Sequence, residues 1–265
     1  MPNSSRAHEP AQQASIKRLR LALGTFVAVE AVSATPELAA AALEAAYAAI
    51  EEVSRRMRPG TAGSDLARIN EAPLLSPVHI HSSVIELLSL ARELNVLTDG
   101  VFDPCLPTKP GRLRDIELSD RAVVCHAPVA LDFGGFAKGY AVDRATDALM
   151  NAGCTAGLVN AGGDLRVFGE QSSPVRVRGR SGSLRRVELN DAALAVSDPE
   201  SSQRPPEHQG YYIRDREATL ATGQIAVMAG EACLADALTK CVLLCPQEVA
   251  ARALDVFGAE RLADQ

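Results

Sequence analysis

The chain has 265 residues, of which 47% are hydrophobic and 23% are charged, and its formal net charge is −6. This composition is typical of a soluble globular chain that buries a core in one or two domains. The acidic charge and the aromatic content of 4% argue against a nucleic-acid-binding protein, which needs a basic face or stacking rings.

The chain begins with a polar stretch, and residues 1–15 are predicted to be a disordered tail ahead of a single domain over residues 16–265. This stretch lacks the apolar segment and small-residue cleavage site of a secretory signal. No run of about 18 apolar residues follows, so no transmembrane helix and no membrane insertion are expected. We therefore expect a cytoplasmic protein.

The six cysteines are scattered through apolar segments without a C-x-x-C pair. This pattern predicts reduced and mostly buried thiols rather than a disulfide framework. A shared metal on Cys241 and Cys245, one helical turn apart, is the less favoured alternative because no further ligand is near in sequence.

The first element predicted is a strand over residues 18–32, where apolar residues alternate with polar ones and Gly24 marks a bulge or a close backbone approach. Thr35 and Pro36 form an N-cap and first-turn pair that predicts a helix ending near Met57. Its core-facing stripe recurs every three or four residues and consists of Leu43, Ala46, Ile50, Val53 and Met57.

A glycine-rich turn and a short helix are predicted within residues 58–70, followed by an amphipathic helix that Ser82 caps. A turn-rich loop begins at Thr98, and a strand-like segment over residues 122–133 leads to a helix over residues 137–151. Gly153 is placed to end that helix.

The last part of the chain is predicted to contain mainly short strands, with two closing helices over residues 231–245 and 247–257. The strands are expected within residues 156–168, 175–197, 210–215 and 223–229. Helices and hairpins interleave without a regular βαβ repeat, which predicts an α+β fold with mixed or antiparallel sheets.

The stretch "LDFGGFAKGYAVDRA" over residues 131–145 places Gly134 and Gly135 between a strand and a helix start. Glycines allow a ligand to approach the backbone, and the N–H groups of a helix N-terminus favour an anion such as phosphate. A tight turn without a ligand is the alternative reading. Asp236 lies in an otherwise apolar helix and must be paired, used as a cap or bound to a metal, because burying a lone carboxylate is costly.

Five stretches, taken in order, resemble the ApbE family of FAD:protein FMN transferases. They are "LGT" at residue 23, "GVFDP" at 100, "DFGGFAKGYAVD" at 132, "NAGGD" at 160 and "ADALTK" at 235. The resemblance implies an ApbE-like fold with two lobes around a flavin cleft. It also implies FAD as the substrate, magnesium as the cofactor, and an acceptor protein whose threonine or serine hydroxyl receives FMN.

The resemblance also implies roles for individual residues. Asp236 is expected to be catalytic. The metal ligands are expected to be the Ala137 carbonyl, Asp236 and Thr239. The expected FAD-binding residues are Leu23, Val101, Phe102, Asp103, Gly134, Lys138, Tyr140 and Ile213.

The sequence departs from the family pattern at several positions. Leu23 replaces a methionine, Gly60 stands where an aromatic residue usually stacks on the flavin, and the segment between Pro104 and Leu131 is short and lacks a tryptophan. Lys240 stands where the family has its metal-binding threonine. Because a charged ammonium cannot be a ligand, either Thr239 replaces that threonine or Lys240 itself fills the cation site.

Two functions remain open at this point. The first is an active FAD:protein FMN transferase. The second is an FAD-binding homologue with weak or lost transferase activity, or an FAD pyrophosphatase that releases FMN and AMP. A nicotinamide-dependent dehydrogenase is disfavoured because its glycine fingerprint and its acidic ribose-binding residue are both missing.

Overall fold

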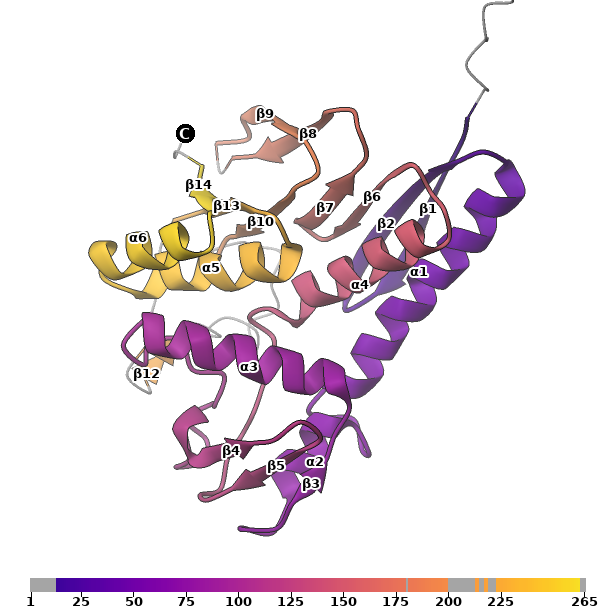
Figure 1. The fold of residues 1–265 in the computed structure, drawn as a ribbon. Coiled ribbons are helices and arrows are strands. Elements are labelled where there is room, and N and C mark those ends of the chain that lie inside the picture. Colours follow the sequence, from indigo (N-terminus) through magenta and orange to yellow (C-terminus); the bar gives the residue numbers. More distant parts are fainter. Residues whose placement is uncertain (1–12, 180, 200–212, 215–216, 219–222, 263–265) are drawn as a thin grey trace, which may run out of the picture.

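The computed structural model describes residues 13–179, 181–199, 213–214, 217–218 and 223–262 (Figure 1). Residues 1–12 of the predicted tail lie outside this part, and strand β1 begins at Ala14, ahead of the predicted domain boundary at residue 16. Within the described residues, no helix is both long enough and apolar enough to cross a bilayer.

The first element is a hairpin of two antiparallel strands, β1 (Ala14–Ala22) and β2 (Thr25–Ser33). The prediction of one strand with a bulge at Gly24 was therefore wrong. Leu23 and Gly24 both have positive φ, 53° and 73°, as in the tight two-residue turns that suit the twist of a hairpin. The sequence concealed this turn because leucine is a rare choice for a left-handed backbone.

Helix α1 (Pro36–Met57) confirms its predicted bounds, its N-cap and its buried stripe. The Thr35 hydroxyl accepts a hydrogen bond from the Leu38 N–H at 3.3 Å. Helix α3 (Ser82–Leu97) also buries the predicted face, but its N-cap is His81, whose Nδ1 accepts from the Ser83 N–H at 3.2 Å. The N-cap acceptor is therefore an imidazole nitrogen and not the Ser82 hydroxyl, which the sequence predicted.

The remaining helices lie within a residue or two of their predicted positions. They are α2 (Asp65–Glu71), α4 (Ala137–Asn151), α5 (Ala232–Leu244) and α6 (Gln247–Val256). Helix α4 ends as predicted ahead of Gly153, which has a φ of 83° that glycine adopts without strain.

The main sheet has the strand order β1-β2-β6-β7-β10-β13-β14. Every pairing among the described strands is antiparallel, which confirms the α+β class. The strands that follow the hairpin are β6 (Ala156–Ala161), β7 (Asp164–Phe168), β10 (Ala193–Ser197), β13 (Ile225–Ala229) and β14 (Glu260–Arg261).

Three smaller sheets accompany the main one. The first has the order β3-β5-β4, and the other two are the pairs β8-β9 and β11-β12. Their bounds are β3 (Val78–His79), β4 (Ile116–Leu118), β5 (Ala122–Cys125), β8 (Ser173–Arg178), β9 (Leu184–Leu189), β11 (Ile213–Arg214) and β12 (Glu217–Ala218).

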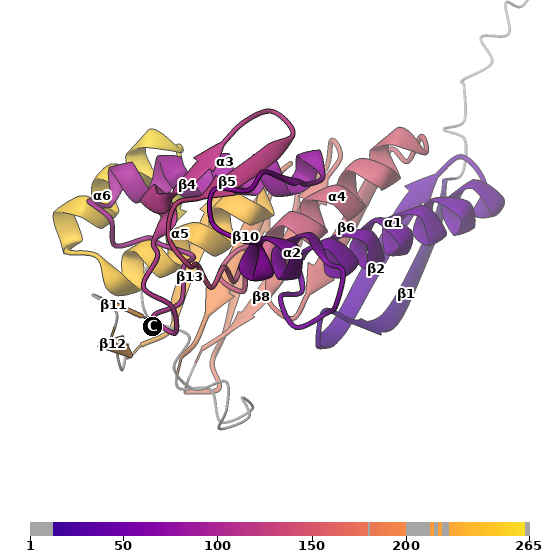
Figure 2. The same ribbon diagram turned by 90° about the horizontal axis from the view of Figure 1, so that it is seen from below.

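Helices α1, α4 and α5 lie along one face of the main sheet and pack on it side by side (Figures 1 and 2). The largest hydrophobic cluster fills the layer between these helices and the sheet. The β8-β9 hairpin packs on the opposite face through a second cluster that includes Leu165, Val167 and Leu189. The three-stranded sheet and α2 lie on the far side of α3 (Figure 1). The start of α4 is thereby placed between the main sheet and the three-stranded sheet.

All six cysteines carry free thiols, and five of them are buried, while Cys245 is partly exposed. The prediction of reduced and mostly buried thiols is confirmed. Burial raises the pKa of the Cys233 and Cys154 thiols above the ordinary value, which keeps them protonated and unreactive.

Candidate functional site

The Gly134-Gly135 stretch forms a tight turn that leads directly into α4. One Asp132 carboxylate oxygen, Oδ1, accepts a hydrogen bond from the Gly134 N–H at 2.6 Å, so the aspartate closes the turn on its own backbone. The Phe133 carbonyl then accepts from the Ala137 N–H at 2.8 Å. The backbone therefore enters the helix with its first N–H groups close to the glycines.

Asn70, near the end of α2, binds the backbone just before the turn. Its side-chain Nδ2 donates to the Leu131 carbonyl at 3.0 Å, and its Oδ1 accepts from the Leu131 N–H at 2.7 Å. The amide thus pairs with the backbone as a neighbouring strand would. Sequence reasoning missed this role, although Asn70 closes the "SDLARIN" stretch in which the short helix was predicted.

We expect Asn70→Ala to lower the free energy of unfolding by about 1–3 kcal/mol, because it leaves both Leu131 backbone groups without their partner. Urea denaturation followed by circular dichroism measures this change. Asn151→Ala, at the exposed end of α4, is the matched control and should change stability by less than about 0.5 kcal/mol. Equal effects of the two variants would show that the Asn70 pairing does not stabilise the turn.

Helices α4 and α5 cap each other's N-termini. Asp143 of α4 accepts hydrogen bonds from the N–H groups of Ala232 and Cys233, at 2.9 Å and 2.8 Å. In return, Asp236 of α5 accepts from the Gly139 N–H in the first turn of α4, at 3.3 Å. Each carboxylate satisfies N–H groups that have no partner within their own helix, and each meets the positive end of the other helix dipole.

The reciprocal capping needs a close approach of the two helices, and Gly139 permits it. A Cβ atom at this position would lie 2.2 Å from the Ala232 carbonyl oxygen, which is far below van der Waals contact. Asp143 also accepts from Arg166 Nη1 at 2.9 Å. Burial raises the pKa of the Asp143 carboxyl, whereas the two backbone N–H groups and Arg166 act in the opposite direction.

Two ion pairs meet beside this helix crossing. The Lys138 ammonium on α4 contacts Asp164 Oδ2 at the start of β7, and the Lys240 ammonium on α5 contacts Asp236 Oδ1. Both aspartates are only 1% exposed, whereas the Lys138 side chain is 34% exposed and the Lys240 side chain is 16% exposed. The sequence predicted sites for Lys138 and Asp236 separately, and the structure joins them through the α4-α5 contact.

The two ion pairs influence each other. Burial, and then the nearby Asp236 carboxylate, raise the pKa of the Asp164 carboxyl to a net value of about 6. The ammonium groups of Lys138 and Lys240 lower the same pKa. The four side chains thus form one electrostatic unit, which we call the charge cluster: Lys138, Asp164, Asp236 and Lys240.

Hydroxyl groups complete the cluster on its β10 side. Ser197, the last residue of β10, lies with its Oγ 2.7 Å from Thr239 Oγ1 and accepts from the Lys240 ammonium at 3.2 Å. Thr239 Oγ1 also donates to the Asp236 backbone carbonyl at 2.7 Å. Sequence reasoning did not identify Ser197, because a serine at the end of a stretch such as "AALAVS" looks like any other serine that ends a strand.

The side-chain oxygens expected to bind a metal already have hydrogen-bond or ion-pair partners. Both Asp236 carboxylate oxygens already have partners, the Lys240 ammonium at Oδ1 and the Gly139 N–H at Oδ2. The Thr239 hydroxyl is fully buried and hydrogen-bonded. Among the described residues, no group of at least three His, Cys, Asp or Glu side chains is able to hold an ion. The side chains present thus do not fit a magnesium ion on Asp236, and the assignment of Ala137, Asp236 and Thr239 as ligands stays a prediction.

The "GVFDP" segment lies against the glycine turn through its aromatic ring. Phe102 packs edge-on against Phe136, with the ring centroids 5.5 Å apart, and Val101 packs on Leu244 of α5. Asp103 uses its Oδ1 to accept from the Cys105 N–H at 2.9 Å. Asp103 therefore shapes its own loop, and the contacts of these three residues with FAD stay predictions.

The other predicted FAD-binding residues have different surroundings. Tyr140 is 6% exposed, and its hydroxyl donates to Glu86 Oε2 at 2.6 Å. Burial raises the pKa of this phenol. Leu23 lies in the hairpin turn, and Thr25, which follows this turn, lies against Gly162. Ile213 belongs to β11, but its side chain lies outside the described residues.

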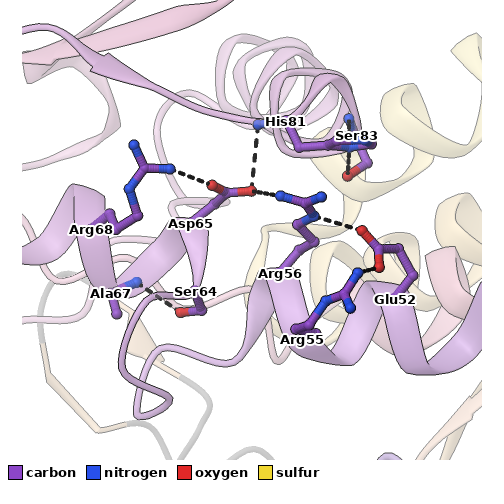
Figure 3. A network of polar contacts seen from close by, with 9 residues as sticks. All are labelled: Glu52, Arg55, Arg56, Ser64, Asp65, Ala67, Arg68, His81 and Ser83. Carbon is purple, nitrogen blue, oxygen red and sulfur yellow. Dashed lines mark hydrogen bonds and ion pairs between the residues drawn. The ribbon is translucent and has the colours of Figure 1, made fainter.

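A buried carboxylate fixes the loop that carries Gly60. Asp65 is 2% exposed and accepts from Arg68 Nη1 at 3.0 Å and from the His81 N–H at 3.4 Å, with Arg56 Nη1 at 3.6 Å (Figure 3). These contacts tie α2 to α1 and to the start of α3. A Cβ at Gly60 would meet nothing within 4 Å, so the position of the family's aromatic residue is open space in this chain.

Comparisons with known proteins identify the family and the fold of the chain. A model of the ApbE family matches residues 23–260 of the chain. In fold, the chain is similar to the apo flavinyl transferase ApbE of Pseudomonas stutzeri, at 17% identity and a TM-score of 0.79, over 94% of this chain and 90% of that one. A search of curated proteins by sequence finds no match.

Two further solved structures share the fold. The flavin transferase ApbE of Vibrio cholerae is 16% identical, with a TM-score of 0.79 over 95% of this chain and 93% of that chain. The ApbE protein of Thermotoga maritima is 19% identical, with a TM-score of 0.77 over 95% of this chain and 97% of that chain.

Proposed function

This chain belongs to the ApbE family, and we propose that it binds FAD and transfers its FMN half to a threonine or serine hydroxyl of an acceptor protein. One observation supports this proposal in addition to family membership. Two ammonium groups, those of Lys138 and Lys240, lie at the glycine turn that begins α4. Fixed positive charge beside a glycine turn and a helix N-terminus suits the diphosphate of a dinucleotide.

The proposed reaction exchanges one phosphorus–oxygen bond for another. The acceptor hydroxyl oxygen attacks the phosphorus of the FMN half, and a phosphoester bond forms there. The bond from that phosphorus to the bridging oxygen breaks, AMP leaves, and the hydroxyl proton is released. No oxidation or reduction takes place. Such a transfer depends on positioning and on neutralising phosphate charge rather than on covalent help from the protein.

An alternative function is favoured by the same cluster. Lys240 gives Asp236 a monovalent partner, which polarises a leaving diphosphate less than a divalent ion does. The chain would then be an FAD-binding homologue with weak or lost transferase activity, or a pyrophosphatase in which water replaces the acceptor hydroxyl.

Incubation of the purified protein with FAD and a flavin-acceptor domain separates these functions. The transferase is expected to add the mass of FMN less one water to the acceptor and to release AMP in equal amount. Free FMN and AMP with an unmodified acceptor would indicate the pyrophosphatase instead. The Asp236→Ala variant serves as the negative control, because it removes the carboxylate that joins α4, α5 and Lys240.

Ligand preference provides an earlier test that needs no acceptor. We expect FAD to bind at least about tenfold more tightly than NAD, a difference of about 1.4 kcal/mol, because three of the family stretches supply the residues of the cluster and no nicotinamide fingerprint is present. Titration calorimetry with both dinucleotides measures the two affinities. Tighter binding of NAD would rule out the proposed function.

A further inference from the structure

Lys240 is built into the turn that the proposed function assigns to the FAD diphosphate. A Cβ at Gly135 would lie 3.9 Å from both Cγ and Cε of Lys240, so the lysine stem runs directly beneath the glycine. Its ammonium contacts Asp236 Oδ1 and donates to Ser197 Oγ at 3.2 Å. The stem and both contacts fix the charge in one place.

This arrangement already satisfies the groups that a divalent ion would need. The ammonium occupies one Asp236 oxygen, and the Gly139 N–H occupies the other. An ion on this carboxylate would have to share it with the ammonium or displace it, and in either case would lie next to a repelling positive charge. The Thr239 hydroxyl is engaged by Ser197 and by its own helix backbone.

The charge balance of the cluster also argues that no divalent ion is needed there. With both carboxylates ionised, the two lysines and the two aspartates sum to zero, so the buried carboxylates are balanced without a divalent ion. Both lysine side chains remain partly exposed while both aspartates are buried, so a ligand from solvent reaches positive charge first. An incoming anion can take hydrogen bonds from these ammonium groups without any additional cation.

We propose that the Lys240 ammonium supplies, as part of the chain itself, the positive charge that neutralises the diphosphate, so that this protein binds FAD without a divalent cation. The inference rests on the proposed function and concerns the same site. Magnesium is accordingly not needed to hold the substrate.

The experiment measures FAD binding by quenching of flavin fluorescence, in EDTA and across a millimolar magnesium series. For the wild type, we expect the dissociation constant to change by less than about threefold between these conditions. Lys240→Met removes the ammonium and adds no ligand, and it should weaken binding by at least about tenfold in both conditions. Lys240→Thr should also bind weakly in EDTA but should regain affinity as magnesium is added.

Two controls keep the result interpretable. Lys17→Met removes an exposed lysine on β1 and should leave FAD affinity unchanged. The melting temperature without FAD gives a second readout, in which magnesium should raise the value for Lys240→Thr but not for the wild type. The wild-type titration decides by itself if neither Lys240 variant folds.

A tenfold or greater gain in wild-type affinity with magnesium would overturn the inference while leaving the proposed function in place. Wild-type affinity in the Lys240→Met variant in EDTA would also overturn it. If the wild type binds no FAD in any condition, the proposed function fails, and the inference fails with it.

Discussion

Replacing Asp143 by alanine is expected to lower the free energy of unfolding by about 3–5 kcal/mol, which is a large part of the stability of an ordinary domain. The carboxylate is 1% exposed and accepts three hydrogen bonds, from two N–H groups at the start of α5 and from Arg166. Its removal leaves the guanidinium and the helix start without their partner in a buried place, where solvent cannot replace it.

Urea denaturation of the purified variant measures this effect. Asp147→Ala is the matched control, because Asp147 lies one turn further along the same helix and pairs with Arg144 at 2.9 Å, but its side chain is 33% exposed. An exposed pair of this kind contributes about 0–1 kcal/mol. Similar losses in both variants would show that capping of α5 by Asp143 is not a main source of stability.

The second large effect is expected at Gly139. Gly139→Ala should lower the free energy of unfolding by about 1–3 kcal/mol, because the new methyl group would lie 2.2 Å from the Ala232 carbonyl oxygen and 2.6 Å from its carbon. Backbone atoms form this obstacle, so a rotamer change cannot relieve it. The intrinsic helix preference for alanine favours the variant by about 1 kcal/mol, so any measured loss underestimates the steric cost.

Thermal and urea unfolding of Gly139→Ala should be compared with those of Gly60→Ala. A methyl group at Gly60 meets no atom within 4 Å, so this control should stay within about 0.5 kcal/mol of the wild type. A stabilised Gly139→Ala variant would mean that α4 and α5 separate at little cost, and that their close contact does not hold the site together.

The sequence predicted the long elements well because their signals are local. The stripe of α1 recurs at helical spacing, and Thr35 and Pro36 mark its start. The hairpin turn at Leu23 was missed because its conformation is imposed by the pairing of β1 with β2 and not by the residue itself. The cap of α3 was misplaced by one residue because serine is a far commoner cap than histidine.

The candidate site was predictable only as a set of separate stretches. The family resemblance marked Lys138 and Asp236, but their neighbours come from distant parts of the chain. Ser197 lies 42 residues from Thr239, and Asn70 lies 61 residues from Leu131. Partners at such separations follow from strand order and helix crossing, which no local pattern specifies. The pairing of Asp236 with Lys240 was accessible from the sequence because the two residues are one helical turn apart.

The reciprocal capping of α4 and α5 also affects the order in which the protein assembles. The capping contacts join residues that are 89, 90 and 97 positions apart, so on a growing chain α4 is complete long before α5 has been synthesised. Until then, Asp143 lacks the two N–H groups of α5, and the Gly139 N–H lacks the Asp236 carboxylate. Closing such a long segment is opposed by chain entropy, and we expect the docking of α5 to be a late step. Under the proposed function, FAD binding would therefore be acquired in that step, so that ligand affinity reports when folding is complete.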